Sequence, residues 1–222
     1  MKILLFVLGC LTCQVYSYVN KVVDLSHWNN VNMRLAQEDG IVGVIHKATQ
    51  GEDYIDPTYQ KRREQAEKLG LLWGAYHFGS GSNLGQVQAD HFLRTVGNHT
   101  NVLLVLDLEP NGSNTMSIEQ AGDFVLRVLE VTGRYPLIYG SPYFLSSYTG
   151  KLDVLRECKL WIAHYTDNAS PILPNGSNSW LFWQYTDGGR GGTPRLVKGI
   201  GPCDRDRFNG EEEDLINKWP HF

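Results

Sequence analysis

A regular alternation of strand-like and helix-like segments from residue 22 onward constrains the fold more than any other feature. Short segments rich in apolar, β-branched and aromatic residues predict strands at residues 22–24, 42–47, 71–77, 102–109, 137–139, 160–165, 180–185 and 203–206. Helical periodicity predicts helices at residues 32–39, 57–69, 85–96, 117–132 and 142–156. Alternating strand and helix units favour a parallel sheet, and eight strands favour its closure into a barrel.

The last three predicted strands lack connecting helices. Residues 167–179 and 187–202 are rich in Gly, Pro, Asn and Ser, which do not support crossover helices. We therefore expect an α/β fold, an irregular TIM-like barrel of five βα units followed by three strands without proper helices. The sequence contains no evident internal repeat or interdomain linker, so residues 18–222 are predicted to form a single domain.

Polar and aromatic side chains recur at the ends of the predicted strands, where the active sites of barrel enzymes lie. The fourth strand ends in Asp107 and Glu109, which face the same side because side chains alternate along a strand. Comparable positions on the other strands hold Asp24, His27, Trp28, Lys47, Thr49, Tyr76, His77, Tyr139, His164, Tyr165, Gln184, Tyr185, Asp204 and Asp206. A shared pocket explains this recurrence better than eight separate structural roles.

The predicted pocket is acidic and aromatic. It holds Asp24, Asp107, Glu109 and Asp204, with Lys47 as the nearest cation. Crowded carboxyl groups cannot all ionise readily, so at least one pKa should be raised, as a general acid near neutral pH requires. Most glycosidases use two carboxyl groups in different environments as their catalytic residues. Sugar rings stack on aromatic side chains, and we expect Tyr76, Tyr139, Trp161, Trp183 and Tyr185 around these acids. A carbohydrate-binding lectin would equally use such an aromatic groove.

Other chemistries find little support in the sequence. Residues 204–210 resemble a calcium loop, but Phe208 occupies the third ligand position. There is no Gly-x-Ser-x-Gly elbow and no closely spaced His/Cys cluster, so we predict neither a metal nor a cofactor. The net charge of −4, without a Lys/Arg run, argues against nucleic acid as a partner. No later stretch is long and apolar enough to span a membrane, and we expect a monomer.

Residues 1–17 have the pattern of a secretory signal peptide. Lys2 precedes an apolar segment at residues 3–11, and we expect cleavage after Ser17. The mature chain would then keep Cys158 and Cys203, which predict one disulfide in an oxidising compartment, with two buried free thiols as the alternative. We therefore expect a secreted, extracellular protein, or a lysosomal or phagosomal one in a eukaryote.

Several segments together resemble the signature segments of glycoside hydrolase family 25, the Chalaropsis-type lysozymes. They are residues 23–28 (VDLSHW), 46–49 (HKAT), 74–78 (GAYHF), 106–109 (LDLE) and 182–185 (FWQY). Asp204 resembles the late strand-end aspartate of the family. The likeness runs from about residue 22 to residue 210, in the order of the family, and it implies the same irregular barrel.

The resemblance also implies hydrolysis of the β-1,4 bond between N-acetylmuramic acid and N-acetylglucosamine in bacterial peptidoglycan. Glu109 would be the general acid and Asp107 its electrostatic or acetamido-orienting partner, while Asp24 and Asp204 complete the acidic pocket. It leaves open whether the substrate's own acetamido group or a water molecule attacks the sugar. We expect the following side chains to contact the substrate: Lys47, Tyr76, His77, Tyr139, Trp161, Tyr165, Trp183, Gln184 and Tyr185.

One position departs from the family pattern, because Gln50 stands where the family often has Glu. We expect activity to survive, since the four acids are kept.

Glycosylation sequons occur at Asn98, Asn111, Asn168 and Asn175. A glycan on Asn111, two residues beyond Glu109, would crowd the cleft, so we predict that this sequon is poorly used.

Two rival functions were weighed against the lysozyme. A chitinase with the D-x-x-D-x-D-x-E motif would need acids at Val102 and Val105, which argues against it. A catalytically inactive, peptidoglycan-binding lectin keeps the same pocket and stays open. The biological role, whether antibacterial defence, digestion or peptidoglycan catabolism, is not determined by the sequence.

Overall fold

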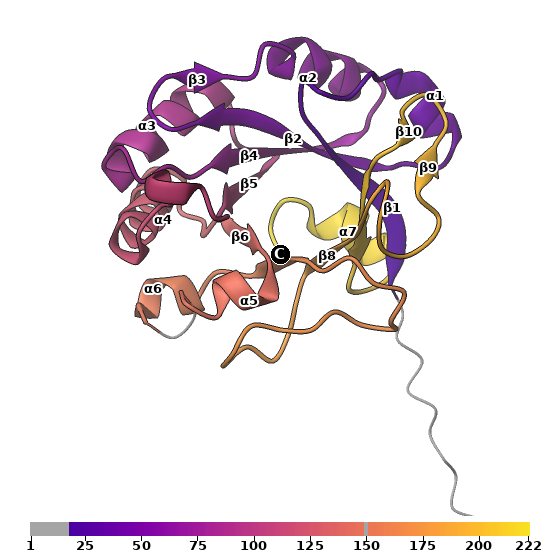
Figure 1. The fold of residues 1–222 in the computed structure, drawn as a ribbon. Coiled ribbons are helices and arrows are strands. Elements are labelled where there is room, and N and C mark those ends of the chain that lie inside the picture. Colours follow the sequence, from indigo (N-terminus) through magenta and orange to yellow (C-terminus); the bar gives the residue numbers. More distant parts are fainter. Residues whose placement is uncertain (1–17, 149–150) are drawn as a thin grey trace, which may run out of the picture.

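The computed structural model describes residues 18–148 and 151–222, so the predicted signal peptide lies outside the described residues. Eight strands form a closed barrel (Figure 1). In order around the barrel they are β1 (Val19–Leu25), β2 (Gly43–Gln50), β4 (Leu72–Phe78), β5 (Val102–Asp107), β6 (Leu137–Gly140), β7 (Leu160–Ala163), β8 (Phe182–Asp187) and β11 (Asp204–Phe208). The barrel closes because β1 pairs with both β2 and β11. The predicted α/β barrel is confirmed.

The last barrel strand runs against the others. Neighbouring strands from β1 through β2 to β8 are parallel, whereas β11 is antiparallel to both β8 and β1. A parallel strand would need a crossover helix, but a loop is enough for an antiparallel one. That loop carries only the short strands β9 (Leu196–Val197) and β10 (Gly201–Pro202). The reversal places Asp204, the first residue of β11, opposite Asp187, the last residue of β8.

Helices cover the outer face of the parallel strands (Figure 1). They are α1 (Met33–Glu38), α2 (Tyr59–Lys68), α3 (Gly85–Val96) and α4 (Ile118–Thr132). The predicted start and end of α4 are confirmed, because Ser117 and Gln120 form a capping box and Gly133 adopts the left-handed conformation with φ of 69°. The two-residue strand β3 (Tyr54–Ile55) adds to the edge of β2, and a 3-10 turn spans Gly112–Asn114.

The single helix expected over residues 142–156 is wrong. Two four-residue helices stand there, α5 (Pro142–Leu145) and α6 (Asp153–Arg156). Ser146 ends the first of them, and its hydroxyl bonds back to the carbonyl of Pro142. Serine side chains compete in this way with helical backbone bonds, which shortens the helix.

Two apolar layers enclose the barrel wall. The inner layer fills the barrel from its lower end with Val22, Ile45, Leu103, Val105, Leu137, Phe182 and Phe208. The terminal helix α7 (Glu212–Lys218) and the residues after it cover that end with Leu215 and Trp219. The outer layer packs the strands against the helices. Because the lower interior is filled, a substrate has access only at the upper end, where the parallel strands terminate.

The predicted disulfide between Cys158 and Cys203 is not formed, since both cysteines are free and buried. Cys158 precedes parallel β7, whereas Cys203 precedes antiparallel β11, so the two lie at opposite ends of the barrel. Burial raises the pKa of each thiol to about 12. The structure therefore supports the alternative of two inert, buried thiols.

No helix among the described residues is both long enough and apolar enough to cross a membrane.

Candidate active site

Alternation along the strands decides which predicted site residues reach the barrel interior. One residue from each strand lines its upper part: Asp24, Lys47, Tyr76, Asp107, Tyr139, Trp161, Gln184 and Asp206. Hydrogen bonds tie several of them together, including those from Tyr139 to Gln184 and from Trp161 to Asp206. The strand-end pocket predicted from the sequence therefore exists, and Glu109 and Asp204 lie at its rim.

Three predicted substrate contacts are wrong, because their side chains point outward through the barrel wall. His77 follows Tyr76 and packs under the helices, bonded to Thr49 Oγ1 at 2.8 Å and Gln88 Oε1 at 3.1 Å. Trp183 and Tyr185 flank Gln184 and enclose the guanidinium of Arg207, 4.5 and 4.2 Å from their ring centroids. All three are fully buried. Neighbouring residues of one strand cannot face the same pocket.

Asp107 and Glu109 differ in depth. Asp107, the last residue of β5, is 6 % exposed, and within the described chain its Oδ1 has no hydrogen-bond partner. Burial raises the pKa of Asp107 well above its usual range, the charge of Glu109 raises it further, and Lys47 opposes both. Glu109 lies at the rim, and burial raises its pKa less strongly. The pair thus combines a deep carboxyl group with an accessible one that can hold a proton.

A second carboxyl pair lies on the opposite strands. Asp24 and Asp206 form a buried carboxyl pair in which each group affects the pKa of the other. Burial raises the pKa of both well above the usual range. Asp206 also accepts a bond from the indole of Trp161 at 2.7 Å.

Asp204 completes the acidic set at the start of β11. Burial, then the charges of Asp187 and Glu109, raise its pKa to about 6. The sequence places Asp206 at a strand end, but the predicted acidic set does not include it. The signal was present, because Asp204 and Asp206 have the same i, i+2 spacing as Asp107 and Glu109.

Gln184 organises the floor of the pocket. Its Oε1 accepts the hydroxyls of Tyr139 and Tyr165 at 2.7 and 2.9 Å, and its Nε2 donates to Asp24 Oδ2 at 2.7 Å. Tyr139 and Trp161 are buried and meet edge to face, with ring centroids 4.5 Å apart. These two rings therefore support the acids from below, and the partly exposed Tyr165 is the ring of this group that a sugar can reach.

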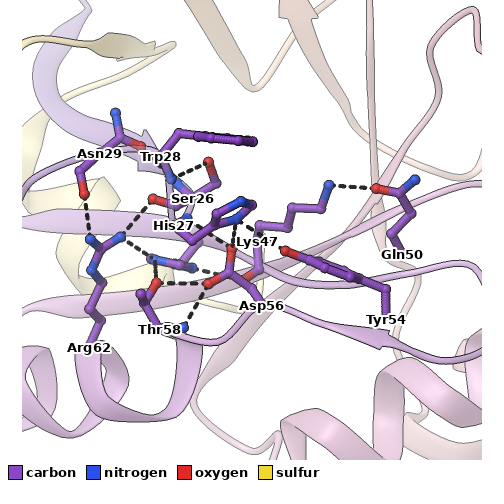
Figure 2. Close-up of polar contacts among 11 residues, drawn as sticks. Ser26, His27, Trp28, Asn29, Lys47, Gln50, Tyr54, Asp56, Thr58 and Arg62 are labelled. Atoms are coloured by element: carbon purple, nitrogen blue, oxygen red, sulfur yellow. Dashed lines mark hydrogen bonds and ion pairs between the residues drawn. The ribbon is translucent and has the colours of Figure 1, made fainter.

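Lys47 is the cation of the pocket. Burial lowers its pKa, while the charges of Asp107, Asp56 and Glu109 raise it. Its Nζ donates to Gln50 Oε1 at 2.8 Å (Figure 2). A neutral amide at position 50 leaves the full charge of Lys47 to act on the acids, which a glutamate would partly cancel.

A hollow of about 750 Å³ opens beside Glu109. Tyr143, His164, Tyr165, Ile172 and Arg190 are among the residues that line it. Asn175, one of the four sequon asparagines, is at its edge. A space of this size, with rings and polar groups next to a carboxyl group whose pKa is raised, suits a sugar chain. Across residues 18–148 and 151–222, no group of three or more His, Cys, Asp or Glu residues is placed to hold a metal ion.

A barrel with carboxyl groups of contrasting environment at its mouth defines the class of glycoside hydrolases. Residues 23–192 match the family described as glycosyl hydrolases family 25. The chain belongs to this family, and it is a glycoside hydrolase.

Named relatives share most of the chain. Lysozyme M1 of Streptomyces globisporus is 32 % identical over 210 residues, which cover 87 % of this chain and 69 % of that protein. The N,O-diacetylmuramidase of a Chalaropsis species is 30 % identical over 192 residues, covering 78 % of this chain and 91 % of that protein. A similar structure is the bacterial lysozyme of Streptomyces coelicolor, with a TM-score of 0.78, 31 % identity, and coverage of 89 % and 95 %. The family 25 lysozyme of Aspergillus fumigatus has a TM-score of 0.75, 30 % identity, and coverage of 90 % and 98 %.

Proposed function

We propose that this enzyme is a secreted muramidase that hydrolyses the β-1,4 bond between N-acetylmuramic acid and N-acetylglucosamine in bacterial peptidoglycan. The observation that carries the proposal is the pair of Asp107 and Glu109, whose pKa values are both raised at the only accessible end of the described barrel. The names of the relatives, lysozyme and N,O-diacetylmuramidase, support the same substrate.

Glu109 acts as the general acid in the proposed reaction. It is partly exposed beside the hollow, so a glycosidic oxygen can approach it, and its raised pKa favours the protonated form that a general acid needs. The proton passes to the leaving oxygen as the glycosidic bond breaks, and Glu109 regains one from the water consumed in the reaction. A bound sugar would remove more water from Glu109 and raise its pKa further.

Asp107 lies deeper than Glu109 and interacts with the sugar ring in the proposed reaction. Its buried Oδ1, unpartnered within the described chain, is available to the acetamido N–H or to the positive charge that develops at the anomeric carbon. Lys47 favours the ionised form of Asp107, because its charge lowers the pKa that burial and Glu109 raise. Asp24, held by Gln184, adds a buried carboxyl group on the facing strands, and burial raises its pKa well above the usual range.

We also propose that the protein is exported and acts as a monomer outside the cell or in a lysosome or phagosome. The pattern of residues 1–17 supports export. Defence against bacteria and digestion of bacterial walls are both consistent with such a location.

The test is to incubate the secreted protein with bacterial peptidoglycan and, separately, with chitin. We expect muropeptides with reducing-end muramic acid, and a loss of about 10²- to 10⁴-fold in rate for Glu109→Gln. Glu130→Gln, an exposed glutamate on α4, is the matched control and should keep full activity. Binding without product would support the lectin, and chitobiose without muropeptides would support the chitinase.

A further inference from the structure

An exposed tryptophan stands on the rim of the pocket. Trp28 follows β1 in the turn of residues 26–29 and is 86 % exposed (Figure 2). Neither the acids nor the floor of the pocket involve it. An indole this exposed adds little to the apolar core, and its amphipathic ring is suited to contact a ligand.

The turn that carries Trp28 is held in place from below. The buried guanidinium of Arg62, on α2, donates to the carbonyls of Ser26 and Asn29 at 2.7 and 2.5 Å. Asn29 Oδ1 accepts the backbone N–H of Ser26 at 2.8 Å. The backbone on both sides of Trp28 is therefore fixed, and the indole is presented from a rigid support (Figure 2).

His27 fixes the orientation of the indole. The imidazole and indole centroids are 4.5 Å apart. Asp56 Oδ2 bonds both the backbone N–H and Nδ1 of His27, each at 2.9 Å. Burial favours the neutral form of Asp56, but hydrogen bonds from Thr58 and His27 outweigh it and lower the pKa of Asp56 below its usual value. A buried carboxylate thus anchors the ring on which Trp28 rests.

The support is continuous with the acidic pocket. The hydroxyl of Tyr54 lies 3.1 Å from His27 Nδ1, and Lys47 Nζ lies 5.5 Å from the centroid of Tyr54. Lys47 in turn interacts with the charges of Asp107 and Glu109. A stripe of rings and polar groups therefore runs from the catalytic acids out to Trp28.

On the basis of the muramidase activity proposed above, we propose that Trp28, packed against His27 with the two rings tilted by 38°, forms an outer subsite for a pyranose ring of the glycan chain beyond the cleaved bond. A pyranose has an apolar C–H face edged by hydroxyl and acetamido groups. The subsite matches this pattern, because the indole of Trp28 lies next to the polar side chains of Ser26 and His27 (Figure 2). A protein-docking surface would need a wider apolar patch than one indole.

The first experiment measures kcat/KM on soluble glycan fragments of increasing length. Trp28→Ala should lower kcat/KM by about tenfold on long chains, with the loss shrinking as the chain shortens. Trp28→Phe keeps an aromatic face and should recover part of the loss. Tyr135→Ala, which removes an exposed ring near the closed end of the barrel, is the matched control and should change nothing. A loss independent of length, or no loss at all, would overturn the subsite.

The second experiment separates binding from catalysis. Glu109→Gln, with and without Trp28→Ala, is sedimented with insoluble peptidoglycan. The double variant should be retained about tenfold less strongly. If the wild-type protein cleaves no muramyl bond but this difference is found, the subsite stands and the proposed activity fails. If cleavage is found and the two variants sediment equally, the activity stands and the subsite fails.

Discussion

Replacing Asp204 by Asn should stabilise the protein at neutral pH while it damages the active site. The carboxyl group of Asp204 is partly buried at the start of β11. Burial, Asp187 and Glu109 raise its pKa from 3.8 to about 6. The folded protein therefore holds the proton of Asp204 over a pH range in which the unfolded chain has already released it.

The sign and size of the effect follow from this difference in pKa. Between pH 4 and pH 6 the folded state binds more protons than the unfolded state, so the free energy of unfolding falls as pH rises. A shift of about two pKa units corresponds to about 3 kcal/mol, which is an upper limit for a partly exposed group. Above pH 6 the folded protein is destabilised by the full free energy of ionising the Asp204 carboxyl group in its partly buried site, and below pH 3.8 this destabilisation vanishes. Asparagine is neutral at every pH, so the Asp204→Asn variant does not carry this destabilisation.

Urea unfolding at pH 3.5, 5 and 7 measures the effect. The gap in unfolding free energy between Asp204→Asn and the wild type should be smallest at pH 3.5 and should widen toward pH 7 by up to about 3 kcal/mol. Asp153→Asn is the control, since the side chain of Asp153 is 98 % exposed and should show no such widening. A gap that stays constant with pH would refute the reasoning, because a lost contact contributes equally at every pH.

Three further predictions follow from the placement of side chains. Gln184→Met should lower the free energy of unfolding by about 3 kcal/mol, because the three hydrogen bonds of the Gln184 amide are lost. A loss under about 1 kcal/mol in urea titration would contradict this. Trp183→Phe should lower the free energy of unfolding by about 1 kcal/mol, because the hydrogen bond from the indole to a backbone carbonyl is lost. The KM for peptidoglycan should stay unchanged, and a raised KM would show that Trp183 contacts the substrate. Cys158 and Cys203 should react with iodoacetamide only after unfolding, and an intact mass that increases on reduction would show that they are bonded.

Much of the site could be read from local sequence patterns. The alternation of segments predicted eight barrel strands, and the i, i+2 spacing predicted that Asp107 and Glu109 share a face. The same alternation along a strand places Tyr76 and His77 on opposite faces, and it does the same for Gln184 and its two aromatic neighbours. The three outward residues His77, Trp183 and Tyr185 therefore cannot share the pocket with Tyr76 and Gln184.

The sequence by itself determined the order of the elements, the five βα units and the acids at their ends, because periodicity and turn residues are local properties of a chain. Only the tertiary structure decided the direction of β11, which separates Cys158 from Cys203 and carries Asp204 to the mouth. It also decided that Asp24 and Asp206 form a buried carboxyl pair. Strand direction and carboxyl pKa values depend on burial and on partners from other strands, such as β1 for β11 and Asp206 for Asp24, and no local pattern contains them.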